Sequence, residues 1–388
     1  MSNGHYPDFP RSEYELRYGR AREIMKQRGL DVLFITEETN YVYFTGHRSQ
    51  QNPIDKIRPY LFFLPLKGNP VVIVMPFEEY HVRATTWIED VRLYRELHTH
   101  NDVVEKTIRD FGLENGRIGC ELGREQYLEI SYNDFVDLKS RFPEASFEDA
   151  SEVLLRLRAI KSPAEVERCR AASELTARAM DRLLKTIHVG MTELEVAQTL
   201  RRFMVDEGAE KVTFLIVASE FRLDGGKVSI PTSRVLQRGD MVTVDTGTEL
   251  QGYASDICRT IAVASATERQ RELYRYLIDL NFKSYEALKP GNLCEDVALL
   301  CQREMARLGI KTQGGGRIGH GVGRESTEYP SLAPGEKVKI EPGMIFSCNP
   351  NFLTESGFFN SEENLLITQN GFEFLSQPIA PSELFVTG

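Results

Sequence analysis

Residues 241–260, MVTVDTGTELQGYASDICRT, predict two antiparallel strands joined by a tight turn. Valines alternate with polar residues in the first half, which is the pattern of a half-buried strand. Gly252 marks the turn, and the β-prone run YASDICRTIAV follows it. A turn centred on Leu250–Gln251 is expected to place Asp245 directly opposite Asp256.

Two acids in that position require an explanation. Directly opposed residues of antiparallel strands have Cβ atoms roughly 4.5–5.5 Å apart, and like charges at that distance destabilise the pair. The two carboxyl groups can share a proton, which raises one pKa. They can also bind a divalent cation, whose bonds to oxygen are about 2.0–2.2 Å long. Two aspartates at solvated hairpin ends remain the plain alternative.

Charge and composition exclude some partners. The chain has 388 residues and a net charge of −10, so we expect no nucleic-acid or anionic-membrane partner. We find no apolar run near the roughly 18 residues of a membrane span, and no signal-peptide core at the N-terminus. The six cysteines are scattered without a CxxC pair. We expect reduced, structural thiols and a cytoplasmic location.

Helical and extended patterns predict two domains. Strands alternate with helices over roughly residues 10–150, which predicts an α/β domain at 1–158. A capping box then begins a new helix, with Ser162 as N-cap, Pro163 first in the helix and Glu165 closing the box. Thr192, with Glu195 three residues later, repeats the arrangement at a second helix start. Long helices mixed with antiparallel strands follow, so we expect an α+β domain at 159–388.

The second half also carries further polar residues in distinctive settings. These are His320 in IGHGVG, Asn349 in IEPGMIFSCNP, and Glu362 and Glu363 in FNSEENLLIT. Each has an ordinary explanation as a turn residue or a solvated strand end. Taken together, the hairpin aspartates, His320 and Glu362 form an oxygen-rich set with one imidazole. Such a set suits a divalent metal that activates water.

The motifs as a set resemble one family. IKSPAEVERCRAA, VDTGTELQGYASDICRT, GHGVG, PGMIFSCNP and SEENLLIT are similar to segments of the pita-bread metallopeptidase and creatinase family. That group includes methionine aminopeptidases, Xaa-Pro aminopeptidases, prolidases and non-peptidase relatives. The resemblance implies a creatinase/prolidase-like α/β domain followed by a pita-bread catalytic domain, and a homodimer.

The resemblance also implies metal roles for individual residues. Asp245 would bind one ion, Asp256 and Glu362 would bridge two ions, and His320 would bind the second. The family's remaining glutamate falls on Asn349, whose neutral amide is a weaker ligand than a carboxylate. We therefore expect at most one well-held ion, manganese or zinc, and a second site that is weak or absent.

Two histidines of the peptidases are missing. The segment 221–234 contains none, and Thr327 and Glu328 stand where the family has His-Glu. In the peptidases these imidazoles transfer protons, for which a pKa near neutrality matters. Their loss leaves His320, Glu328 and Glu363 as the catalytic candidates.

We therefore predict a hydrolase that cleaves a C–N bond in a small substrate with the help of a metal. The substrate would be an Xaa-Pro dipeptide or a nitrogenous solute such as ectoine or creatine. The alternatives are a metal-free enzyme like creatinase or ectoine hydrolase, a lyase on the same scaffold, and a non-catalytic binding module. Metal content and side-by-side assays separate these alternatives.

Overall fold

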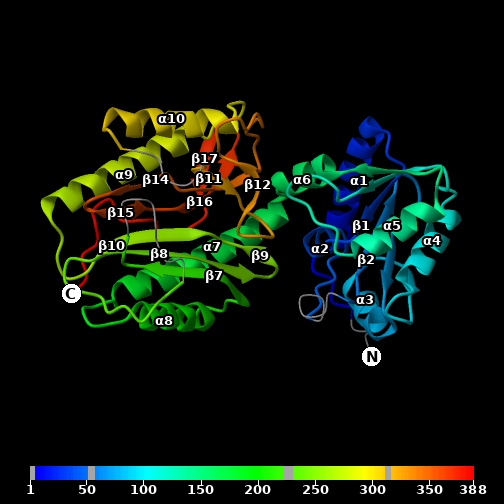
Figure 1. The fold of residues 1–388 in the computed structure, drawn as a ribbon, viewed down its shortest axis with the longest axis horizontal. Coiled ribbons are helices and arrows are strands. Elements are labelled where there is room, and N and C mark those ends of the chain that lie inside the picture. The colour runs from blue at the N-terminus through cyan, green and yellow to red at the C-terminus, as the bar shows by residue number, and fades with distance from the viewer. Residues whose placement is uncertain (1–4, 51–56, 222–229, 311–315) are drawn as a thin grey trace. The chain divides into compact units, whose positions relative to one another are not determined.

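The computed structural model describes residues 5–50, 57–221, 230–310 and 316–388. Contacts divide the chain into two compact units, Met1–Leu157 and Arg158–Gly388, and each is described by itself (Figure 1). Within the described ranges, every helix is too short or too polar to cross a membrane.

The N-terminal unit is built on a six-stranded mixed sheet with the order β4-β3-β2-β1-β5-β6. The pairs β1–β2 and β2–β3 are antiparallel, and the pairs β3–β4, β1–β5 and β5–β6 are parallel. Its strands are β1 (Val32–Ile35), β2 (Leu61–Pro65), β3 (Val71–Val74), β4 (Asp90–Leu93), β5 (Arg117–Cys120) and β6 (Ser146–Asp149). Its helices are α1 (Arg11–Arg28), α2 (Glu38–Thr45), η1 (Pro76–Glu78), α3 (Glu79–Thr85), α4 (His100–Asp110) and α5 (Tyr132–Arg141), and α6 (Ser151–Ala159) runs into the boundary.

Helices pack against both faces of this sheet, because alternate residues of a strand point to opposite sides. Leu33 and Ile35 of β1 share a buried core with residues of α1, α2 and α6. Val32 and Phe34 of the same strand pack with α4 and α5. The result is the predicted α/β layering, which buries all four residues of β1.

Two helices of the C-terminal unit begin where the sequence predicts. Ser162 accepts a hydrogen bond from the N–H of Glu165, whose side chain accepts one from the N–H of Ser162, at the start of α7 (Pro163–Leu184). Thr192 and Glu195 form the same capping box at the start of α8 (Glu193–Asp206). Each cap stabilises its helix by about 1 kcal/mol, so the predicted helix starts are confirmed.

In the described part of the C-terminal unit, the strands form three sheets. The first has the order β10-β8-β7, with β9 beside β8, the second has the order β12-β11-β13-β16-β17, and β14 pairs with β15. Their bounds are β7 (Lys211–Ala218), β8 (Met241–Leu250), β9 (Tyr253–Ala254), β10 (Ile257–Ala262), β11 (Gly319–Gly321), β12 (Glu328–Ser331), β13 (Ile345–Cys348), β14 (Asn351–Thr354), β15 (Gly357–Asn360), β16 (Glu363–Thr368) and β17 (Gly371–Phe374).

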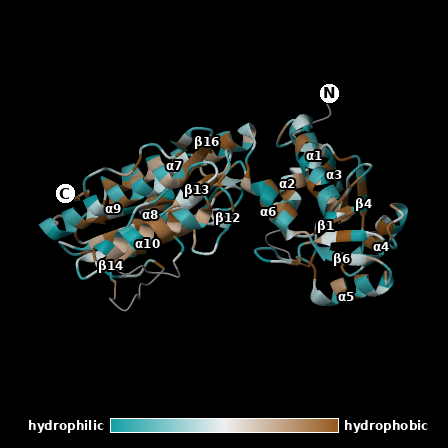
Figure 2. Ribbon diagram, turned by 90° about the horizontal axis from the view of Figure 1, so that it is seen from above, coloured by the Kyte–Doolittle hydropathy of each residue, from teal (hydrophilic) through white to brown (hydrophobic). Residues whose placement is uncertain are grey.

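A pair of helices packs against each of the two larger sheets. Leu183 of α7 and Leu200 of α8 share a buried core with Val217 and Val244 of the first sheet. Helices α9 (Glu268–Ala287) and α10 (Cys294–Arg307) share another core with β13 and β16 of the second sheet. The strands therefore lie between two helical layers (Figure 1), and the helices carry both hydrophilic and hydrophobic stretches (Figure 2).

The register of the β8–β10 hairpin differs from the predicted one. Asp245 is paired with Cys258, two residues beyond Asp256, and the turn closes with Leu250 opposite Tyr253. Gln251 and Gly252 form the turn with φ of 52° and 73°, a backbone that matches the twist of the flanking strands. The expectation that Asp245 faces Asp256 directly is therefore wrong. The two aspartates are diagonal neighbours on one face.

Candidate metal centre

The β8–β10 hairpin is joined to the second sheet beside Asp256 and Glu362. The N–H of Glu362 donates to the carbonyl oxygen of Cys258 at 3.1 Å. Arg259 Nη1 donates to the carbonyl oxygen of Glu362 at 2.9 Å, and the same guanidinium forms a buried ion pair with Glu363 at 3.0 Å. These contacts bring Asp256, on the hairpin, next to Glu362, the residue before β16.

Asn364 fixes the backbone of Asp256. Its Oδ1 accepts a hydrogen bond from the N–H of Asp256 at 3.0 Å, and its Nδ2 donates to the carbonyl oxygen of Asp256 at 2.7 Å. Ser173 of α7 donates to the same Oδ1 at 2.9 Å. The fully buried Asn364 thus ties α7, the hairpin and β16 together at the acid.

His320 completes a group of three buried side chains. Its Nδ1 donates to the carbonyl oxygen of Gly321 at 3.0 Å, so its Nε2 carries the lone pair. That Nε2 lies 3.5 Å from Asp256 Oδ2 and 3.8 Å from Glu362 Oε1. Ser347, paired with His320 across the β11–β13 ladder, donates to Glu362 Oε1 at 2.6 Å. One atom from each of Asp256, His320 and Glu362 lies within 4.8 Å of the others.

The electrostatics of this group fit a divalent cation. Burial and the neighbouring carboxylates raise the pKa of both Asp256 and Glu362. Burial and the charge of Arg317 lower the pKa of His320 to about 4, so its imidazole is neutral near pH 7. Within the described residues, the buried Oδ1 of Asp256 accepts no hydrogen bond. A cation would relieve the repulsion between the acids and occupy this oxygen.

Asp245 and Asn349 lie at the edge of the group. Asp245 is half-buried on β8, and its charge contributes to the raised pKa of Asp256 and of Glu362. Asn349 follows β13, is also half-buried, and its side chain hydrogen-bonds Glu362. The amide of Asn349 can donate to that carboxylate, whereas an ionised glutamate at this position could not.

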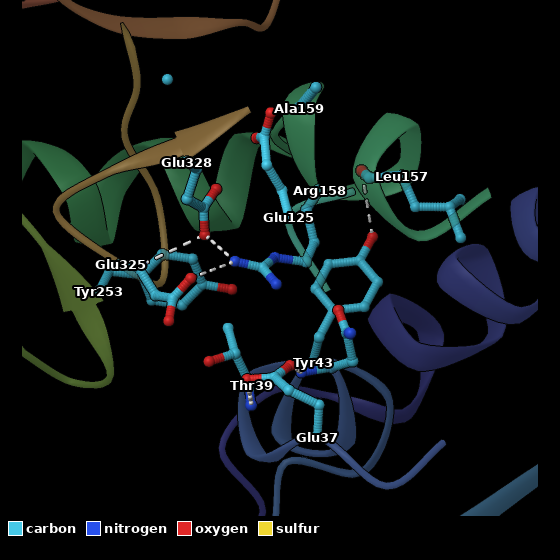
Figure 3. A network of polar contacts seen from close by, with 12 residues as sticks. Glu37, Thr39, Tyr43, Glu125, Leu157, Arg158, Ala159, Tyr253, Glu325 and Glu328 are labelled. Carbon is cyan, nitrogen blue, oxygen red and sulfur yellow. Dashed lines mark hydrogen bonds and ion pairs between the residues drawn. The ribbon is translucent and has the colours of Figure 1, made fainter. Parts of the chain in front are cut away.

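Glu328 contacts two basic side chains, Arg158, which Figure 3 shows beside it, and Lys161. Its Oε1 accepts from Arg158 Nη2 at 2.5 Å, and its Oε2 lies 3.4 Å from Lys161 Nζ. Arg158, Lys161 and Glu328 are all buried. Gly323 leaves room for them, because a Cβ there would lie 2.6 Å from Glu328 Oε2. The charges of Arg158 and Lys161 balance the acid. Its catalytic assignment stays a prediction, and its contacts argue for a positioning role.

Glu363 has a similar setting. Besides Arg259, its carboxylate accepts hydrogen bonds from the hydroxyl of Ser376 and the N–H of Ala380. These contacts also favour a positioning role. Thr327, which stands where the family resemblance implies a histidine, is exposed and offers a hydroxyl.

Sequence reasoning missed four residues of the centre and its surroundings: Asn364, Ser347, Arg158 and Lys161. Asn364 follows two predicted acids directly, but nothing in a strand pattern shows which way its amide points. Arg158 and Lys161 lie in the charged segment before α7, where the only sequence signal was the helix cap.

Comparisons with known families match both units. The sequence model of Metallopeptidase family M24 matches residues 167–369, and that of the Creatinase/Prolidase N-terminal domain matches residues 17–160. The first match contains all the predicted metal ligands.

Similar proteins cover nearly the whole chain. An uncharacterised peptidase, YqhT, of Bacillus subtilis is 26% identical over 96% of this chain and 100% of its own length. An Xaa-Pro dipeptidase of Pyrococcus horikoshii is 26% identical over 92% of this chain and 95% of its own.

Solved structures establish the fold. A prolidase from Pyrococcus horikoshii superposes with a TM-score of 0.81 at 24% identity, covering 94% of this chain and 99% of that one. A dipeptidase PepE from Mycobacterium ulcerans gives a TM-score of 0.84 at 23% identity, covering 98% and 100%. The predicted pita-bread arrangement, preceded by the α/β domain, is confirmed.

Proposed function

Because the chain belongs to metallopeptidase family M24, we propose that it is a metal-assisted hydrolase that cleaves a C–N bond in a dipeptide-sized substrate. The observation that carries the proposal is the convergence of Asp256, His320 and Glu362, all buried, from segments far apart in the chain. The relatives named Xaa-Pro dipeptidase and prolidase support Xaa-Pro dipeptides as the first substrate class to test.

Asp245, Asp256 and Glu362 would hold a first ion, manganese or zinc. His320 would join Asp256 and Glu362 at a second position. A divalent cation would lower the pKa of a water molecule and polarise the carbonyl group of the substrate. The protein's own residues hold this arrangement in place. Ser347 directs Glu362 Oε1, and Asn364 fixes the backbone that carries Asp256. The neutral Nε2 of His320 offers a lone pair toward both acids.

We propose a single well-held ion. Asp245, Asp256 and Glu362 provide three carboxylates for a first ion, whereas a second ion would meet an amide at Asn349. That amide already hydrogen-bonds Glu362. The replacement removes one negative charge from the second position and so weakens binding there.

A nitrogenous solute such as ectoine or creatine is the second candidate substrate. The observation that favours it is the exposed Thr327 where the peptidases have an imidazole. A hydroxyl has no pKa near neutrality, so it cannot replace histidine as a general acid.

The test combines metal analysis with parallel assays. The full chain is purified without chelator, its metal content is measured, and an Xaa-Pro dipeptide, creatine and ectoine are assayed with added manganese or zinc. We expect hydrolysis of the dipeptide that a chelator abolishes and that the Asp256→Asn variant lacks. Turnover that survives complete metal removal would point to a metal-free, creatinase-like enzyme. No metal and no turnover would favour the binding module.

The predicted homodimer and cytoplasmic location are part of the proposal. Light scattering of the purified chain measures the first, and fractionation of cells that express it measures the second.

A further inference from the structure

A second group of metal-type side chains lies in the N-terminal unit. His47 follows α2, Glu78 ends η1, and His81 lies on α3. His47 Nε2 is 3.2 Å from Glu78 Oε2, His81 Nδ1 is 3.1 Å from the same oxygen, and the two nitrogen atoms are 3.3 Å apart. Three donor atoms thus form a nearly equilateral triangle.

The dimensions of this triangle match those of a bound ion. Zinc lies about 2.0–2.2 Å from imidazole nitrogen and carboxylate oxygen, so two ligand atoms at the tetrahedral angle lie roughly 3.3–3.5 Å apart. The three observed separations, 3.2, 3.1 and 3.3 Å, lie within about 0.2 Å of that range. We propose that His47, Glu78 and His81 bind a zinc-class divalent cation, with the fourth position open. This site is independent of the proposed function.

Outer contacts orient the two buried ligands. The hydroxyl of Tyr41 lies 2.9 Å from Nδ1 of His47. The other oxygen of Glu78 accepts hydrogen bonds from Ser49 and Tyr60, both at 2.7 Å. Metal ligands in proteins are held by such second contacts, which fix the ring and leave one atom to face the ion.

Protonation also suits a metal. Burial lowers the pKa of His47, so its imidazole is neutral near pH 7. Burial alone would raise the pKa of Glu78, but hydrogen bonds from His47, Ser49 and Tyr60 outweigh it and lower the pKa to about 2. With a cation at Nε2, the single ring proton of neutral His47 would lie on Nδ1, where it would donate to the oxygen of Tyr41.

The ligand types select the class of ion. Calcium and magnesium take oxygen ligands, whereas two imidazoles and one carboxylate suit zinc and its late transition-metal neighbours. The side chain of His81 is 42% exposed while those of His47 and Glu78 are 0% and 5% exposed. The ion would therefore enter from the His81 side.

The first experiment counts zinc. The same separations also fit two N–H···O hydrogen bonds without any ion, so binding itself must be measured. Full-length wild-type protein, His81→Ala and His98→Ala are dialysed against micromolar zinc and analysed for metal. His98 is an exposed histidine of the same unit and serves as the matched control. We expect His81→Ala to bind one zinc fewer per chain than the other two proteins. Equal zinc in all three would overturn the proposal.

The second experiment places a reporter at the site. All six natural cysteines are buried and none is in a disulfide. His81→Cys loaded with cobalt should gain one thiolate-to-cobalt absorption band per chain, whereas His98→Cys should gain none. A His81→Cys protein without the band, or the same band in both variants, would sink the idea. Circular dichroism checks that each variant is folded.

Discussion

The side-chain amide of Asn364 holds the backbone of Asp256 at both its N–H and its carbonyl group, at 3.0 and 2.7 Å. One buried residue on β16 therefore sets the position of a proposed ligand on the hairpin. The contact explains how Asp256 on the hairpin and Glu362 beside β16, which are far apart in sequence, come to lie close together.

Replacing Asn364 should loosen the centre. In Asn364→Ala the backbone of Asp256 loses both hydrogen bonds, and we expect affinity for manganese or zinc to fall about 10–100-fold. Titrations in a His81→Ala background count only ions at the centre. Asn370→Ala, at an exposed position of the same unit, is the control. Equal affinities of the two variants would contradict the role of Asn364.

Restoring a carboxylate at Asn349 should strengthen the second ion. In Asn349→Glu a carboxylate replaces the amide that hydrogen-bonds Glu362. This fourth acid adds negative charge and an oxygen ligand. We expect the centre to hold two ions per chain in place of one, again in the His81→Ala background. Asn349→Gln, which keeps the neutral amide, should stay at one. An unchanged count in Asn349→Glu would refute the proposed cause.

Glu328 should act on stability through its ion pairs. Burial alone would raise its pKa, but the charges of Arg158 and Lys161 outweigh it and lower the pKa below 4.5. This acid therefore stabilises the fold above about pH 4.5, and the contribution is lost as the pH falls through its lowered pKa. Glu328→Gln should abolish this part of the acid dependence and cost about 3–5 kcal/mol near pH 7, because two buried cations lose their partner.

The matched control for that change is Glu325→Gln. Glu325 contacts the same Arg158 at 3.1 Å, but its side chain is 51% exposed. Its loss should cost under about 1 kcal/mol. Urea unfolding of both variants between pH 3 and 8 measures the difference. Similar decreases in the free energy of unfolding for the two variants would argue against a special role for the buried ion pairs.

Gly247 should be intolerant of any side chain. A Cβ there would lie 2.2 Å from the carbonyl oxygen of Ser255, the residue before Asp256, and this oxygen belongs to the backbone. Gly247→Ala should lower stability by about 1–3 kcal/mol and weaken metal binding. Gly19→Ala, in α1 with nothing within 4 Å, should raise stability by roughly 0.5–1 kcal/mol. Thermal unfolding measures the stability of both variants. Unchanged stability of Gly247→Ala would show that the hairpin backbone can move to accept the side chain.

Local signals predicted much of the fold. The capping boxes at Ser162 and Thr192 involve residues three apart, so the sequence alone specifies both helix starts. The register of the hairpin was harder to predict. Gln251 and Gly252 both adopt positive φ, and the centre of the turn lies one residue beyond the expected place. Strand β11 gave no signal, since Gly-His-Gly has no β-prone side chain.

The centre was predictable only in part. Its proposed ligands were found through motifs, whereas Asn364 and Ser347 act through contacts that no local pattern encodes. The triangle of His47, Glu78 and His81 was also missed. Glu78 and His81 are three residues apart, but His47 reaches them from another segment, and only the tertiary structure shows their closeness.

The bond from Arg259 to the carbonyl oxygen of Glu362 joins residues 103 positions apart. During synthesis, the hairpin therefore leaves the ribosome long before its counterpart exists. A nascent chain can fold its early helices and strands, but the acids of the hairpin stay exposed to solvent until the segment with Glu362 emerges. Loading of the proposed centre with metal would thus be a late event, and a chain truncated before Glu362 would lack this residue, Asn364 and their contacts to the hairpin.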